Sequence, residues 1–191
     1  MGQRDRRTRK SERGRRDHPL EEFGFKSLEE VAAAEAVDPS VVPPPRDGPK
    51  GRLLAFDYGT VRVGLAISDH DRRMASPLEN YTRVGVEADG DYFRQLAKRE
   101  QAVGLVVGLP IHMDKTETRE SDAARLYAKW LTELTGLPVA MWDERLSSFG
   151  ADDLMAGSGL THRQKKQRRD KLAAMLILQA YLDAGCPATE T

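Results

Sequence analysis

Residues 53–69 place the tightest limit on the fold, because they have the pattern of two buried strands joined by a short turn. Leu53–Phe56 is an apolar run and Val61–Ser68 is rich in branched residues, and both patterns favour buried strands. Asp57 ends the first strand, where a carboxylate is costly unless it binds a cation or faces a substrate. The alternative is an ordinary hairpin whose aspartate caps its own turn. Gly59 permits the turn and lets a backbone or phosphate come close.

The rest of the chain alternates between helix and strand patterns. Val103–Leu109 is a continuous apolar run that ends at Pro110, which is typical of a strand covered on both faces. Further strands are expected in part of 74–82 and over 137–141, and helices over 91–101, 116–134, 147–155 and about 164–184. A hairpin followed by this alternation predicts an α/β fold, a mixed sheet with helices on both faces.

One domain with a basic extension is expected. Residues 1–50 begin Arg-rich and largely disordered, then carry a capping box, Ser27 with Glu30, that predicts a short helix. The run Pro43–Pro45 predicts an extended linker. The folded domain is expected over 51–185, and 186–191 form a tail.

Composition excludes several classes of protein. Net charge is zero, so basicity of the whole chain does not indicate an anionic partner, but residues 4–16 and 162–169 form two local basic clusters. The single Cys186 excludes an internal disulfide and a cysteine metal cluster. No apolar run approaches 18 residues, so no transmembrane helix is expected, and the basic N-terminus is not expected to be a secretory signal because no apolar run follows it. A cytoplasmic protein without membrane contact is predicted.

Acidic residues follow the ends of several expected strands, where ligands gather in sheets of this kind. Asp143 and Glu144 both stand at a strand end and face opposite sides, so spacing allows only one to join Asp57 and does not say which. Asp170 shares a helical stripe with Ala174, Ile177 and Tyr181, which turns it toward the sheet; the alternative is a favourable interaction with the helix dipole. Three carboxylates without cysteine suit Mg²⁺ or Mn²⁺.

Five segments together carry a family resemblance. They closely resemble, in order and spacing, the YqgF/RuvX family of ribonuclease H-like nucleases, which are Holliday-junction-resolvase-like proteins linked to maturation of the 5′ end of pre-16S ribosomal RNA. The segments are Ala55–Thr60 with Gly64–Ala66, Val107–Pro110, Met113–Asp114, Asp143–Ser147 and Asp170–Ala174. The resemblance covers about 51–185 and implies a ribonuclease H-like mixed five-stranded sheet with helices on both faces.

The resemblance implies a catalytic and metal-binding trio of Asp57, Glu144 and Asp170, which selects Glu144 over Asp143. Two divalent ions held there would activate water and stabilise the leaving oxygen in phosphodiester cleavage. Gly108, Asp114 and Arg145 match motif positions with supporting roles. Two features depart from the family: Lys115 stands where members commonly have glycine, and compact members lack the N-terminal extension. His112 in the same loop is a candidate general acid or simply solvated.

Several residues near the proposed trio are candidates for nucleic-acid binding. Arg145 suits a phosphate, or alternatively an ion pair with Asp143. The basic stretch before Asp170 would attract a phosphate backbone, although it also fits a solvated helix start, and the Arg-rich tail fits either RNA affinity or solubility. The full set is Gly59, Lys115, Arg145, Arg163, Lys165, Lys166, Arg168 and Arg169.

The preferred hypothesis is a metal-dependent endonuclease that processes the 5′ end of pre-16S ribosomal RNA. A non-catalytic assembly factor that binds ribosomal particles and a resolvase of DNA junctions are the alternatives. A resolvase needs a dimer, and the sequence is compatible with a monomer or weak homodimer. The Asp57 turn also resembles the first phosphate loop of actin-like ATPases and sugar kinases, but one domain over 51–185 cannot supply the two related domains those proteins need.

Overall fold

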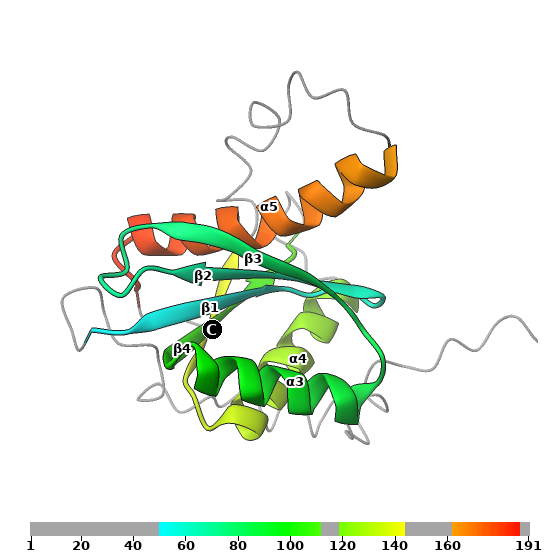
Figure 1. Ribbon diagram of the computed structural model, residues 1–191, viewed down its shortest axis with the longest axis horizontal. Helices are drawn as coiled ribbons and strands as arrows, with labels where there is room; N and C mark the ends of the chain where they lie inside the picture. Colours follow the sequence, from blue (N-terminus) through cyan, green and yellow to red (C-terminus); the bar gives the residue numbers. More distant parts are fainter. Residues whose placement is uncertain (1–49, 112–118, 144–161, 188–191) are drawn as a thin grey trace, which may run out of the picture.

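The computed structural model describes residues 50–111, 119–143 and 162–187, with side chains described from 172 onward in the last range. Five strands and three helices occupy these residues (Figure 1). In chain order they are β1 (Arg52–Asp57), β2 (Arg62–Ser68), β3 (Ala75–Thr82), α3 (Val86–Arg99), β4 (Ala102–Leu109), α4 (Arg119–Thr135), β5 (Val139–Asp143) and α5 (His162–Asp183).

The strands form one mixed sheet in the order β3-β2-β1-β4-β5, so the strand that ends in Asp57 is central. β1 pairs antiparallel with β2 and parallel with β4, and β2 alone runs against the other four described strands. Pro77 lies in β3, at the edge of the described sheet, where its missing N–H does not interrupt a central ladder. The predicted α/β fold with a mixed five-stranded sheet is confirmed.

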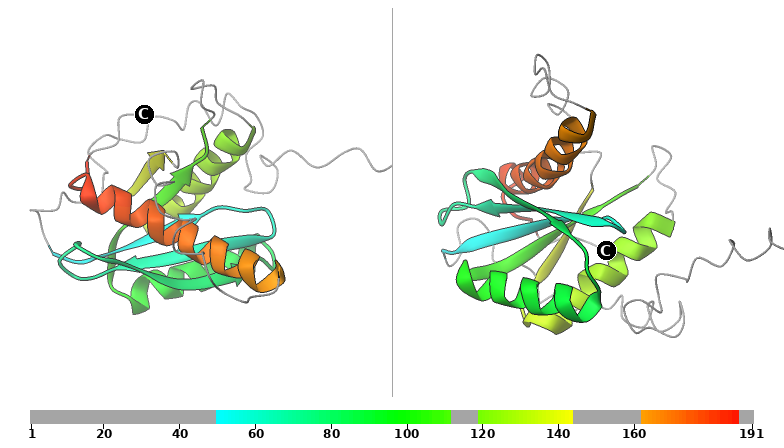
Figure 2. Two further views of the ribbon diagram at one scale, coloured as in Figure 1. Left: turned by 90° about the horizontal axis from the view of Figure 1, so that it is seen from above. Right: turned by 45° about the vertical axis from the view of Figure 1, so that its right-hand side comes forward.

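Helices cover both faces of the sheet, as expected (Figures 1 and 2). Leu54 and Phe56 of β1 face a core shared with α3 and α4, whereas Leu53 and Ala55 face a core shared with α5. This alternation is the normal pleat of a strand buried on both sides. β4 is buried from Gly104 to Leu109, which the continuous apolar run predicted. The core therefore divides into an α3/α4 layer and an α5 layer.

The element boundaries differ from the sequence expectations at several ends. α3 begins at Val86, five residues before the expected start at Asp91, and the Asp89 carboxylate in its first turn accepts the backbone N–H groups of Val84 and Gly85 that precede the helix. β5 begins at Val139 and continues to Asp143, two residues later at each end than expected. The helix expected over 147–155 and the extension over 1–49 lie outside the described residues.

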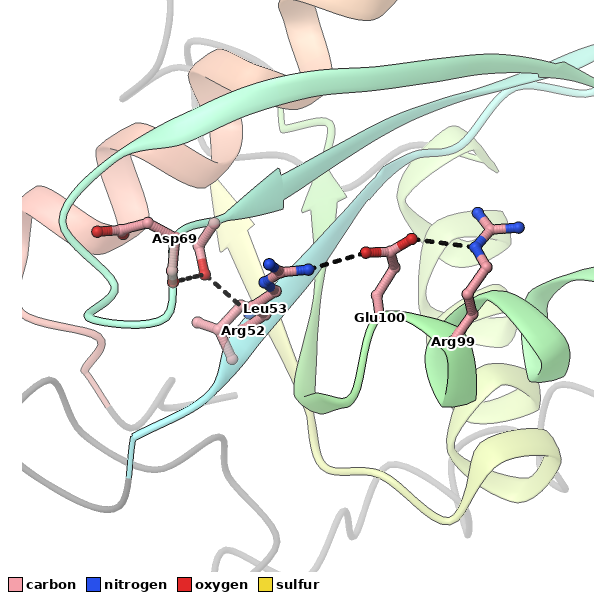
Figure 3. A network of polar contacts seen from close by, with 6 residues as sticks. Arg52, Leu53, Asp69, Arg99 and Glu100 are labelled. Atoms are coloured by element: carbon pink, nitrogen blue, oxygen red, sulfur yellow. Dashed lines mark hydrogen bonds and ion pairs between the residues drawn. The ribbon is translucent and has the colours of Figure 1, made fainter.

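The end of β1 remote from Asp57 is closed by polar contacts (Figure 3). Glu100 accepts hydrogen bonds from Arg52 Nη1 and Arg99 Nε, each at 3.0 Å. Leu53 N donates to Ser68 Oγ at 2.9 Å, which joins β1 to the end of β2. These contacts fix the start of the central strand.

No helix within 50–111, 119–143 or 162–187 is long and apolar enough to cross a bilayer.

Candidate functional site

A pocket of about 300 Å³ opens at the carboxyl end of the central strand. It is lined by one continuous stretch and one residue beyond it: Asp57, Tyr58, Gly59, Thr60, Val61, Arg62 and Gly64. Asp57 is half-buried there, so its carboxylate is held by the fold and still reached by solvent. The turn between β1 and β2 is therefore the wall of a pocket as well as a connection.

Asp57 lies on the sheet face that α5 covers. By strand alternation it shares that face with Leu53 and Ala55, both of which pack in the α5 layer. Its partner across the β1–β2 ladder is Gly64, and Gly108 directly follows Val107, the β4 partner of Phe56. The strand neighbours of Asp57 on this face are thus glycines, which add no side chain beside the carboxylate. Gly108 thereby gains a physical reason for its position in the family motif.

The alternation of β5 separates Asp143 from Asp57. Ala140 and Trp142 pack in the α5 layer, whereas Val139 and Met141 pack in the α3/α4 layer. Asp143 follows Trp142 and so falls on the α3/α4 face, opposite to Asp57. Of the two acids that spacing left open, Asp143 is therefore the one that cannot join Asp57 on a common face.

Helix α5 runs antiparallel to β1 across this face (Figures 1 and 2). Gln179 near its C-terminal end accepts the N–H of Ala75 at 2.9 Å and donates to the carbonyl of Arg73 at 3.2 Å, so that end is fixed beside the β2–β3 turn. Ala174, Ile177 and Tyr181 are buried against the sheet, which confirms the predicted apolar stripe. The segment that begins at His162 consequently extends toward the Asp57 end of the sheet.

The remaining predicted site residues fall where side chains are not described. Glu144, Arg145, Lys115, Asp114 and His112 lie outside the described residues. The backbone of α5 carries the others, but their side chains lie outside the description: Arg163, Lys165, Lys166, Arg168, Arg169 and Asp170. Among the described residues no group of three His, Cys, Asp or Glu is placed to hold a metal ion. Asp57 is the member of the proposed trio whose side chain is described. Its carboxylate oxygens are of the ligand type that Mg²⁺ or Mn²⁺ binds.

Sequence reasoning missed the residues that support the Asp57 turn from behind. Tyr58 packs against Tyr127 of α4, with ring centroids 4.7 Å apart and the ring planes tilted by 34°. Arg83 contacts Tyr58 and the buried Asp89. Burial would raise the pKa of the Asp89 carboxyl, but N–H groups of Val84 and Gly85, with Arg83 and Tyr81, hold that pKa below its usual value. Burial, the hydrogen bond to Asp89 and its negative charge raise the pKa of Tyr81 to about 12.

Gly59 is required by the turn itself. A Cβ atom built at this position would stand 2.5 Å from the carbonyl oxygen of Arg62. The sequence suggested that a backbone or a phosphate comes close to Gly59. The backbone that does so is the carbonyl group of Arg62.

We expect Gly59→Ala to force the turn open and to lower the free energy of unfolding by about 1–3 kcal/mol, the usual penalty of overpacking. Urea unfolding measures this effect. Val61→Ala is the matched control, because Val61 lies in the same turn with 65% of its surface exposed. Equal stability of the two variants would contradict the steric role of Gly59.

A family model and the curated relatives agree on one family for this chain. A model of the family described as "RuvX: Holliday junction resolvase" matches residues 51–184. A protein of Rhodopirellula baltica named "Putative pre-16S rRNA nuclease" is 45% identical over 134 residues, which cover 70% of this chain and 78% of that protein. One of the same name from a Bradyrhizobium species is 37% identical, with coverages of 70% and 83%. The solved T. thermophilus RuvC in complex with a Holliday junction substrate has a TM-score of 0.46 at 13% identity, covering 71% of this chain and 96% of RuvC.

Proposed function

Since this chain belongs to the RuvX family of Holliday-junction-resolvase-like nucleases, we propose that it is a divalent-metal-dependent endonuclease for ribosomal RNA precursors. The reaction is hydrolysis of a phosphodiester bond by water, in processing of the 5′ end of pre-16S ribosomal RNA. The names of the curated relatives support this substrate. The observation that carries the proposal is Asp57 in an open pocket, with Gly64 and Gly108 beside it on the α5 face.

The metal would be held by Asp57 together with Glu144 and Asp170. Bound Mg²⁺ or Mn²⁺ would supply positive charge that stabilises the developing negative charge on the phosphate and its leaving oxygen. The chain's own contribution is to fix Asp57 at the end of a rigid central strand. The direction of α5 supports a role for Asp170. The helix runs antiparallel to β1, so its N-terminal half, which carries position 170, extends toward the end of the sheet where Asp57 lies.

Among the described residues that line the pocket, Arg62 carries a positive charge, and we expect it to bind a substrate phosphate. It lines the same pocket as Asp57, and its planar guanidinium matches two phosphate oxygens. Arg62→Gln is expected to weaken RNA binding and to reduce the slope of log K against log salt by about one.

Fluorescence anisotropy at several salt concentrations, with catalysis suppressed by chelator, measures the Arg62 effect. Arg52→Gln is the matched control, because Arg52 lies at the opposite end of the sheet beside Glu100. A salt slope that does not change in Arg62→Gln, or that changes as much in Arg52→Gln, would contradict a phosphate contact at Arg62.

The proposed function is tested with the purified full chain and a transcript that spans the 5′ end of 16S ribosomal RNA with its leader. Cleavage in Mg²⁺ or Mn²⁺, its loss in EDTA and its return on adding metal are expected. A four-way DNA junction of equal concentration serves as the competing substrate. Cleavage of the junction alone would move the substrate to DNA. Absence of cleavage of both substrates would reject the endonuclease and favour a non-catalytic RNA-binding factor.

A further inference from the structure

We propose that Tyr58, Arg83 and Asp89 form a positioning network that holds the Asp57 turn in the geometry that catalysis requires. The inference rests on the proposed nuclease function for its catalytic part, and its structural part is tested separately. The three residues, here called the Tyr58–Arg83–Asp89 network, come from the turn after β1, the segment after β3 and the first turn of α3. None of them belongs to the proposed metal-binding trio.

The network begins at a buried ion pair. Arg83 Nε donates to Asp89 Oδ2 at 3.0 Å, and the two side chains are only 6% and 1% exposed. Asp89 Oδ1 accepts from Tyr81 Oη at 3.0 Å, from Val84 N at 2.9 Å and from Gly85 N at 3.3 Å. Tyr81 and Arg83 reach Asp89 from the end of β3 and the segment after it, and the two N–H bonds come from the residues that lead into α3. We infer that this buried, hydrogen-bonded pair favours one conformation of the segment that joins β3 to α3.

The ion pair fixes Arg83 over the ring of Tyr58. The guanidinium carbon of Arg83 lies 5.5 Å from the centroid of that ring, and Arg83 Nη1 donates to Tyr58 Oη at 3.4 Å. The Tyr58 ring also packs against Tyr127 of α4, which is fully buried, with ring centroids 4.7 Å apart. Tyr58 is therefore held by contacts with a cation and with a buried aromatic ring.

The position of Tyr58 determines the position of Asp57. The two residues are adjacent, so by alternation Tyr58 faces the α3/α4 layer while Asp57 faces the α5 layer. Arg83 N also donates to the carbonyl of Val61 at 3.0 Å, which ties the far side of the same turn. The turn is thus held at both ends by one residue, and a ligand carboxylate displaced by about 1 Å can lower the rate about a hundredfold.

Arg83→Met tests the proposal, because it keeps much of the side-chain volume and removes both the ion pair and the contact with Tyr58. We expect kcat for RNA cleavage to fall about tenfold to a hundredfold, with KM changed less than about twofold. Tyr58→Leu should reproduce this loss, and Tyr58→Phe, which keeps the ring, should remain within about threefold of the unmodified chain. Arg94→Met is the matched control, since Arg94 pairs with Asp91 at the surface of α3.

Hydrogen exchange of the apo protein gives a second readout that does not depend on activity. In Arg83→Met the amides of residues 58–62 should exchange about tenfold faster, while those of β4 keep their protection. A change of KM without kcat, or wild-type kcat with unaltered exchange, would overturn the proposal. If Arg83→Met does not fold, Tyr58→Leu with Tyr58→Phe decides by the same two measurements. If the unmodified chain cleaves no RNA, the nuclease proposal fails and hydrogen exchange alone decides whether the network holds the turn.

Discussion

Asp57→Asn is expected to lower metal-dependent RNA cleavage about a thousandfold while the protein stays folded. Among the described residues that line the pocket, Asp57 supplies the carboxylate, and the substitution removes its negative charge while keeping the size of the side chain. Loss of about 4 kcal/mol of charge stabilisation in the transition state corresponds to about a thousandfold in rate. Single-turnover cleavage of the leader transcript measures the effect, and circular dichroism with thermal unfolding reports the fold.

Asp143→Asn is the control for Asp57→Asn. It is the same chemical change at the end of the neighbouring parallel strand β5, on the opposite face of the sheet. Cleavage by Asp143→Asn should stay near that of the unmodified chain. Undiminished cleavage by Asp57→Asn would remove Asp57 from the site. Equal losses of cleavage in Asp57→Asn and Asp143→Asn would show that negative charge at this end of the sheet matters on either face. Such a result would contradict a specific catalytic site on the α5 face.

The second large effect is expected on stability, from Asp89→Asn. Removing the charge leaves Arg83 buried without its anionic partner, and breaking a buried ion pair in this way costs about 3–5 kcal/mol. Urea unfolding at pH 7 measures the difference. Asp91→Asn, two residues along the same helix, breaks a surface pair in which Asp91 is 71% exposed, and should change stability by less than about 1 kcal/mol.

The stability difference between the unmodified chain and Asp89→Asn should also depend on pH. The pKa of Asp89 in the folded protein lies below its ordinary value of 3.8, so on acidification the unfolded chain takes up the proton first. The contribution of Asp89 is therefore complete above about pH 4 and is lost as the pH falls through the folded pKa. The unfolding free energies of the two proteins should converge below pH 4, and a constant difference down to pH 2 would contradict the assignment.

The sequence was most informative where burial is complete. The apolar run of β4 and the stripe Ala174, Ile177 and Tyr181 have periodicities that only a covered strand and a sheet-facing helix satisfy, and both predictions were correct. Asp57 was predicted to end a central strand because an acid directly follows an apolar run. The start of α3 was missed because Asp89 has the pattern of a surface residue, and only tertiary contacts bury it.

The candidate site was less accessible to sequence reasoning. Arg83 is separated from Tyr58 by a whole hairpin, and their contact depends on the β2–β3 pairing and on Asp89, none of which has a local signature. The face of the sheet on which Asp57 lies became known only from the two layers of the core. The trio of Asp57, Glu144 and Asp170 remains a prediction, because two of its side chains lie outside the described residues.

The position of α5 has a consequence for how the protein is made. All five strands precede this helix in the chain, and α5 alone among the described helices buries Leu53, Ala55 and Ala140. A ribosome therefore completes the described strands before α5 emerges, and until then no described helix covers this apolar face of the sheet. Position 170 arrives on the same helix. The proposed site, which includes position 170, would therefore be complete only after α5 has been synthesised.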